Sequence, residues 1–173
     1  MQTAIVNNPF KSSHFVWMDF AINHVAKDTH CIHEWMGKVP DKIRQMCINP
    51  FVEKDDPREL FHNIYHHTAG GLFSGRADML LRYCGWFRET VKRMLYQESW
   101  FQIDEAVMSM VQRQHPECFD LYFGDYEGIV ANYVTPRFNQ DLILQGLQKC
   151  LAWGETKKAG EIQRFLNQTP KKN

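Results

Sequence analysis

The clearest hydrophobic pattern in the chain is helical and lies in residues 76–99. Apolar side chains recur there at spacings of three and four, which places them on one face of an α-helix. They are Met79, Leu80, Tyr83, Phe87, Val91, Met94 and Leu95. A second amphipathic helix is predicted over residues 103–116, with Asp104 near its start and a proline at its end. Residues 139–167 predict two further helical segments, joined near residues 153–154, that form a hairpin on the outside of the domain.

Shorter apolar runs between turn residues predict the strands. Residues 14–20, HFVWMDF, are almost continuously apolar, which is typical of a strand buried on both faces. Further strands are expected at residues 1–6 and 41–49. We expect residues 63–75 to form a strand, a glycine turn and a second short strand, and residues 119–134 to form a strand, a turn and a short strand.

Strand, helix and loop thus alternate in a mixed α/β pattern, with a loop and a helical turn at residues 21–37 and a solvated turn at residues 53–61. A chain of 173 residues is long enough for one domain. We expect this domain to occupy residues 1–138 and to be followed by a helical extension at residues 139–173. Because ligands bind at strand ends in open α/β sheets, the unusual residues near those ends are the candidates for function.

Composition and charge narrow the classes of partner. The formal net charge is +0, with 20 basic and 20 acidic residues, which argues against general electrostatic binding to nucleic acid or anionic membrane. The five cysteines are widely spread and never in a CxxC spacing, so a reducing compartment is expected. No apolar run approaches the ~20 residues of a membrane-spanning helix. We therefore expect a cytoplasmic protein without a transmembrane segment.

Asp19 is the one carboxylate within the apolar run FVWMDF. A hard cation such as Mg²⁺ or Mn²⁺ binds through one or two carboxylates together with substrate phosphates, so one well-placed aspartate is enough to begin such a site. The alternative is that Asp19 only caps the turn at the end of the strand.

The segment HHTAGGLFSGR, residues 66–76, is rich in glycine. Glycine serves where a backbone turns sharply or a ligand approaches closely. Ser74 and Arg76 could present polar groups there to a sugar or a phosphate. The segment lacks the motifs of a P-loop and of a dinucleotide site. An ordinary hairpin turn remains the alternative.

An acidic pair, Asp104 and Glu105, stands at the start of the second predicted helix. Acids at a helix N-terminus are favoured by the helix dipole, so a stabilising role is one interpretation. The functional alternative is a general base, a nucleophile or an acceptor of substrate hydroxyls.

The histidines allow a metal site of another kind, because His62, His66 and His67 lie close together in the sequence and His30 and His33 form a second pair. The HExxH pattern is absent, and residues 62–67 favour a strand, so this alternative is remote.

The order of these features resembles a known family. VNNPFKSSHFVWMDFAINHV is similar to the "NPF…FxWxDxG" segment of the small HtrL/YibB-like glycosyltransferases of bacteria and viruses. YHHTAGGLFSGRADML and the stretch from residue 100 to residue 133 continue the resemblance, which covers roughly residues 4–135. The order GG-x-F-x-G followed by DE is also similar to the retaining glycosyltransferases of the blood-group A/B type. The resemblance implies a GT-A fold, a Rossmann-like sheet that binds a nucleotide sugar through a divalent metal.

The resemblance also implies a role for each matched position. Asp19 would hold Mn²⁺ or Mg²⁺ against the diphosphate of the donor, and Trp17 would pack near the nucleotide. The glycine turn, with Arg76, would bind the donor sugar or its phosphate; its glycines are Gly70, Gly71 and Gly75. Asp104 would bind sugar hydroxyls, and Glu105 would act as a base or as a nucleophile or stabiliser beneath the anomeric carbon.

The resemblance has two departures. The usual metal motif of the fold is DxD, whereas here Trp17 takes the first position, a tryptophan that the HtrL/YibB-like proteins share. A GT-A domain also opens with a strand–helix–strand portion that binds the nucleoside, and little of it precedes Asp19, so we expect a truncated fold.

The expected function is a metal-dependent glycosyltransferase that moves a sugar from a nucleotide-sugar donor to a glycan-type acceptor. A homo-oligomer or a partner chain could supply the missing N-terminal half. The alternative is a non-catalytic carbohydrate- or protein-binding remnant of a GT-A domain.

Overall fold

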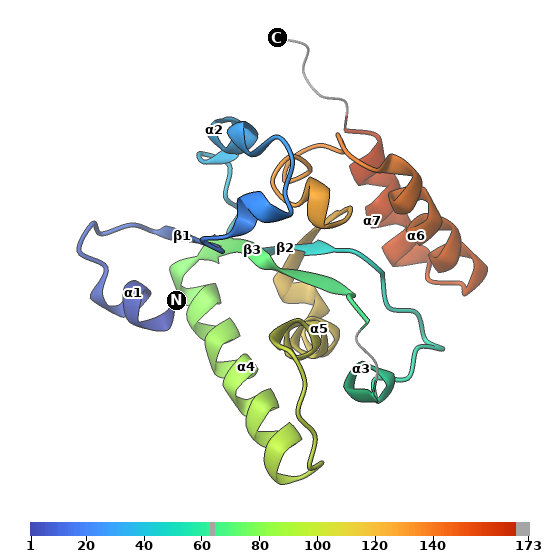
Figure 1. Ribbon diagram of the computed structural model, residues 1–173, viewed down its shortest axis with the longest axis horizontal. Coiled ribbons are helices and arrows are strands. Elements are labelled where there is room, and N and C mark those ends of the chain that lie inside the picture. The colour runs from blue at the N-terminus through green and yellow to red at the C-terminus, as the bar shows by residue number, and fades with distance from the viewer. Residues whose placement is uncertain (63–64, 169–173) are drawn as a thin grey trace.

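A four-stranded mixed sheet forms the centre of the molecule (Figure 1). The computed structural model describes residues 1–62 and 65–168, with the backbone alone at residues 61–62. The strands, in the spatial order β1-β3-β2-β4, are β1 (His14–Met18), β2 (Ile43–Cys47), β3 (Thr68–Arg76) and β4 (Phe119–Phe123). β3 is antiparallel to β1 and β2, and β2 is parallel to β4. The mixed α/β class predicted from the sequence is thus confirmed.

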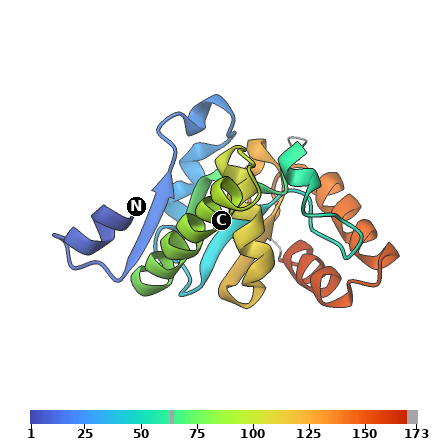
Figure 2. The same cartoon turned by 90° about the horizontal axis from the view of Figure 1, so that it is seen from below.

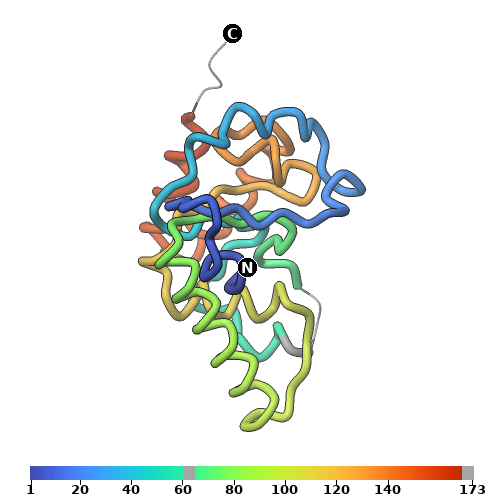
Figure 3. Tube along the Cα trace, turned by 90° about the vertical axis from the view of Figure 1, so that its left-hand side faces the viewer, coloured from blue at the N-terminus to red at the C-terminus, as the bar shows by residue number. Residues whose placement is uncertain are grey.

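Two helices cover one face of the sheet, α4 (Ala77–Tyr96) and α5 (Asp104–Gln114), as Figure 2 shows. Both match the helices predicted from the apolar period. Leu80 and Tyr83 of α4 and Val111 of α5 are buried with Phe73 of β3 in one core. The N-terminal helix α1 (Gln2–Asn7) packs beside α4 (Figure 3).

The other face of the sheet carries a larger core. It includes α2 (Ile32–Trp35) and the hairpin of α6 (Gln140–Ala152) and α7 (Thr156–Leu166), which confirms the predicted helical pair. Trp35 stacks on Tyr133 with ring centroids 4.1 Å apart. Phe165 of α7 meets Phe123 of β4 edge to face at 5.7 Å, so the hairpin is part of this core. The remaining short elements are α3 (Glu59–His62), η1 (Ile22–His24), η2 (Thr29–Cys31), η3 (Pro116–Cys118) and η4 (Tyr126–Gly128).

Three of the strand predictions are wrong. Residues 1–6 form α1 and not a strand, because Ile5 of this segment is buried in the core beside α4. β1 is not buried on both faces, because it is the edge strand of the sheet, and Val16 and Trp17 are 40% and 43% exposed. After β4, the described chain turns into η4 and further turns where a second short strand was expected.

The glycine segment also differs from its prediction. Of residues 63–75, residues 63–64 lie outside the described chain. From Thr68 onward the segment is one continuous strand, β3, with its glycines inside the strand and not in a hairpin turn.

Over the described ranges, no helix is long and apolar enough to cross a membrane. All five cysteines are unpaired, and four of them are buried.

Candidate functional site

The candidate site lies at one edge of the sheet, where several chain segments meet. β1, β2 and β4 run in the same direction, so their carboxyl ends share this edge with the start of the reversed strand β3. Asp19 follows the end of β1, and Tyr126 follows the end of β4. Carboxyl ends of strands are the usual position of ligand sites in open α/β sheets.

The paired glycines Gly70 and Gly71 lie in an irregularity of β3. Gln45 of β2 pairs with Phe73, whereas Cys47 pairs with Thr68, so two steps along β2 are matched by five along β3. The extra residues form a bulge, which is a common place for glycine in a strand. The glycines were predicted to allow a close approach, and the structure places them at the edge that holds the candidate acids.

The absence of a side chain at Gly70 gives space to the Glu105 carboxylate, and Asp19 lies beside Gly71. A Cβ atom at Gly70 would lie 3.2 Å from both Cγ and Oε1 of Glu105. A Cβ atom at Gly71 would lie 3.9 Å from Cβ of Asp19. Asp19 and Glu105, which are far apart in the sequence, therefore each lie beside one of two adjacent glycines.

Asp19 continues the pairing of β1 with β3 by one residue, because its backbone N–H donates to the carbonyl of Gly71 at 2.8 Å. Its Oδ1 accepts the backbone N–H of Ala21 at 3.0 Å, and its carbonyl accepts the N–H of Ile22 at 3.1 Å. Asp19 thus caps the turn after β1, as the alternative interpretation expected. The residue is nevertheless exposed, so its carboxylate can also meet a ligand.

The acidic pair opens α5. Asp104 is exposed, and Glu105 is partly buried beside Gly70. Burial, followed by hydrogen bonding to the Asp104 carboxylate, raises the pKa of Glu105 to about 7, whereas the Tyr126 hydroxyl opposes this shift. A carboxyl with that pKa can hold or release a proton near neutral pH, as a general acid or base must.

Tyr126 is a member of the site that the sequence did not reveal. It lies in η4, and its hydroxyl is 2.8 Å from Nδ1 of His66, the ring of which it meets edge to face at 5.3 Å. Burial, followed by the nearby Glu105 carboxylate, raises the pKa of the Tyr126 hydroxyl. The hydroxyl therefore stays protonated and joins Glu105 on one side to the exposed His66 on the other.

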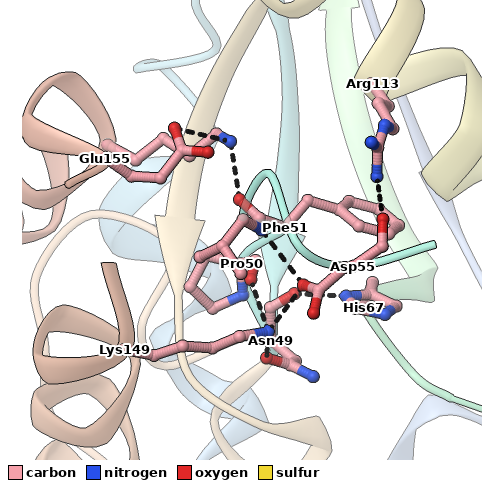
Figure 4. A network of polar contacts seen from close by, with 10 residues as sticks. Asn49, Pro50, Phe51, Asp55, His67, Arg113, Lys149 and Glu155 are labelled. Atoms are coloured by element: carbon pink, nitrogen blue, oxygen red, sulfur yellow. Dashed lines mark hydrogen bonds and ion pairs between the residues drawn. The ribbon is translucent and has the colours of Figure 1, made fainter. Parts of the chain in front are cut away.

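A polar network anchors the approach to β3, as Figure 4 shows. Nζ of Lys149 in α6 donates to Oδ2 of Asp55 at 2.7 Å. The same ammonium donates to Oδ1 of Asn49 and to the carbonyl of Pro50, both at 3.0 Å. Nδ1 of His67 lies 2.6 Å from the Asn49 carbonyl. Because His67 directly precedes β3, this loop links the start of β3 to α6.

Two hollows flank the end of β1. Trp17 stacks on Phe73 at 6.2 Å, and both line a hollow of about 320 Å³ together with Asp104 and Arg88. The second hollow, of about 440 Å³, lies beside Asp19 and Phe20. The structure therefore brings Trp17 and Asp104 together, as a shared ligand site requires.

Gly75 and Arg76 are not brought to this edge. They lie at the opposite end of β3, where Arg76 pairs with His14 at the start of β1. Six residues of strand at about 3.3 Å each separate Arg76 from Gly70 by about 20 Å. Arg76 is bound there to Asp78, at 2.6 Å from Nε. A Cβ atom at Gly75 would lie only 2.9 Å from a backbone carbonyl oxygen, so close packing explains this glycine.

The side chains at this edge that could bind a metal ion suit only one kind of metal site. In the part of the chain that the structure describes, no group of three or more His, Cys, Asp or Glu side chains could hold a metal ion. The side chain of His62, one of the histidines of the remote alternative, lies outside the described residues. One exposed carboxylate, Asp19, fits a hard cation that is shared with a phosphate ligand, and does not fit a closed protein cage.

The sequence model of the HtrL_YibB family, described as "Bacterial protein of unknown function", matches residues 1–133. The match covers the sheet and the whole candidate site, and it ends before α6 begins at Gln140. No curated protein and no solved structure matches the chain.

Proposed function

The chain belongs to the HtrL_YibB family, and we propose that it is a metal-dependent glycosyltransferase of the GT-A fold. It would move a sugar from a nucleotide-sugar donor to a glycan-type acceptor in the cytoplasm. One observation carries the proposal: Glu105 and Asp19 lie against the adjacent residues Gly70 and Gly71 at the carboxyl edge of the sheet. A sugar at this edge could meet a metal-binding carboxylate and a proton-transferring carboxyl, with the partly exposed backbone of Gly71 beside them.

Asp19 is the residue that would hold Mn²⁺ or Mg²⁺ together with the donor diphosphate. Its Oδ1 is already oriented by the N–H of Ala21, so the carboxylate is fixed before any ligand arrives. Fixed ligands bind with a smaller loss of conformational entropy. A bound cation would supply neutralisation of the charge that develops on the nucleoside diphosphate as it leaves.

The hollow beside Trp17 would receive the donor. Asp104 lies in its wall and would accept hydrogen bonds from sugar hydroxyls. Arg88 lines the same hollow, whereas Arg76 lies at the far end of β3. We therefore assign to Arg88 the phosphate contact that the sequence pattern suggested for Arg76.

Glu105 would remove the proton from the acceptor hydroxyl. Its pKa of about 7 places the transfer near neutral pH, where both the charged and the neutral carboxyl are populated. The Tyr126 hydroxyl, held by His66, would orient the Glu105 carboxylate. Gly70 leaves room for this side chain beside the backbone of β3.

The test is binding and hydrolysis of a panel of UDP- and GDP-sugars, with Mn²⁺ or with EDTA. We expect binding that needs the metal, and slow donor hydrolysis that Glu105→Gln lowers. Asp19→Asn should abolish the metal dependence, whereas Asp141→Asn, an equally exposed aspartate on α6, should not. Binding without any response to metal would refute the enzyme assignment and favour a non-catalytic binding module.

A further inference from the structure

The turn after β1 holds one aromatic ring entirely in solvent. Oδ1 of Asp19 accepts the N–H of Ala21, and the Asp19 carbonyl accepts the N–H of Ile22. The residue that directly follows Asp19 therefore lies at the tip of a tight turn. That residue is Phe20, which is 103% exposed. Leaving a phenylalanine exposed forgoes the stabilisation that its burial would give. Phe10 and Phe101 are also exposed, at 88% and 84%, so exposure alone does not define a site.

Phe20 differs from the other two because it forms a wall of the 440 Å³ hollow beside Asp19. The buried side chains of Ile22 and Val130 form an apolar floor. Asn23 and Thr29 also line the hollow, and neither side chain has a hydrogen-bond partner within the described part of the protein. An aromatic wall, an apolar floor and a few unpaired polar groups are the usual composition of a small-molecule site.

The charges of the two hollows differ in a way that indicates the ligand. No lysine or arginine lines the hollow of Phe20, and Asp19 is its one charged lining residue among the residues described. In the metal-free protein an anionic ligand would therefore find no counter-charge there, unlike in the hollow of Trp17, which contains Arg88. A neutral ring with one apolar face and several hydroxyls would match Phe20, Asn23 and Thr29.

We propose that the hollow lined by Phe20, Asn23 and Thr29 binds a neutral pyranose, with the sugar ring stacked on Phe20. Asn23 and Thr29 would exchange hydrogen bonds with the sugar hydroxyls. That this sugar belongs to the acceptor glycan rests on the proposed function, in which the donor occupies the other hollow, lined by Trp17. The binding of the sugar itself needs neither a metal nor a donor.

Ligand-observed NMR with a panel of neutral disaccharides, including lactose, maltose, cellobiose and chitobiose, tests this site without metal or nucleotide. We expect at least one of them to bind. Phe20→Ala should weaken that binding at least about tenfold, the effect of losing a contact worth about 1.4 kcal/mol. Asn23→Ala should weaken it several-fold. Phe10→Ala is the matched control, an exposed phenylalanine outside the hollow, and should change affinity less than twofold.

The outcomes separate this proposal from the proposed enzyme function. Saccharide binding that Phe20→Ala removes, in a protein that shows no metal-dependent nucleotide binding, would support this site and refute the glycosyltransferase. No binding by any neutral saccharide, or equal binding by Phe20→Ala and Phe10→Ala, would overturn this site alone. Preference for acidic saccharides or nucleotides in this hollow would overturn it as well. Phe20 is fully exposed, so Phe20→Ala should keep the wild-type melting temperature. An unchanged melting temperature would show that a loss of saccharide binding is not caused by unfolding.

Discussion

Glu105→Gln should lose less stability than the wild-type protein as the pH rises through neutrality. The pKa of Glu105 is raised from an ordinary value of 4.5 to about 7, first by burial and then by hydrogen bonding to Asp104. Between these two pH values the native state binds more protons at Glu105 than the unfolded state does, so stability falls as the pH rises. Glutamine keeps the shape of the side chain and cannot ionise, so the variant lacks this loss.

The magnitude follows from the size of the pKa shift. A change from 4.5 to about 7 is about 2.5 units, which corresponds to roughly 3 kcal/mol at 1.36 kcal/mol per unit. Glu105 is only partly buried, and solvent screening reduces this to about 1–2 kcal/mol. The free energy of unfolding of Glu105→Gln minus that of the wild type should therefore increase by about 1–2 kcal/mol between pH 5 and pH 8.

Urea unfolding followed by circular dichroism at both pH values measures this difference. The other titrating groups are common to the two proteins, so the contributions of those that do not interact with Glu105 cancel in the comparison. Glu53→Gln is the control, because Glu53 is an exposed carboxylate. A gap between Glu105→Gln and wild type that stays constant from pH 5 to pH 8, or that narrows, would refute the proposed environment of Glu105.

Three further predictions concern the parts that hold the site in place. Gly75→Ala should lower the free energy of unfolding by about 1–3 kcal/mol in thermal or urea unfolding, because the Cβ of the alanine would lie 2.9 Å from the Lys42 carbonyl oxygen. An unchanged free energy of unfolding would contradict that packing. Asn132→Ala should cost about 2–4 kcal/mol in urea unfolding, because this buried amide makes four hydrogen bonds to the backbone. A loss below 1 kcal/mol would show that these bonds are not formed. Lys149→Met should cost about 1–3 kcal/mol at pH 7. Burial raises the pKa of Asp55, but hydrogen bonding, first of all to Lys149, holds this pKa below its ordinary value. The loss of unfolding free energy in Lys149→Met should therefore shrink once the pH falls below about 4, where Asp55 becomes protonated. A loss that does not depend on pH would contradict the ion pair.

The helices were predictable because their signal is local. The apolar period of residues 76–99 predicts the helix and most of its buried face, including Leu80, Tyr83 and Met94, whereas Leu95 at its end is 41% exposed. β1 shows the opposite case. Its apolar run is typical of a central strand, but whether a strand is central or at an edge depends on the neighbours that the whole fold gives it. Residues 1–6 likewise form a helix because of their contact with α4, which lies more than seventy residues away in the sequence.

The candidate site was predictable in part. Asp19, Gly70 and Glu105 carry residue types that are unusual for their surroundings, and the structure places Glu105 beside Gly70 and Asp19 beside Gly71. Gly75 lies close to Gly70 in sequence, but an extended strand carries it to the opposite edge, which a turn would not have done.

Tyr126 and Phe20 were missed for different reasons. A tyrosine after a turn is common, and only the pairing of β2 with β4 brings Tyr126 to the same edge as His66. Phe20 belongs to an apolar run, so its sequence environment indicates burial, whereas the turn made by Asp19 directs it into solvent.

The central claim is that Asp19 holds a divalent cation against the diphosphate of a nucleotide sugar. Calorimetric titration of UDP and GDP into the wild-type protein and into Asp19→Asn, each with Mn²⁺ and with EDTA, tests it most directly. The account predicts binding of at least one nucleotide to the wild type that EDTA weakens at least about tenfold, or about 1.4 kcal/mol, with no metal effect left in Asp19→Asn. Equal nucleotide binding with Mn²⁺ and with EDTA, or the same metal effect in both proteins, would contradict it.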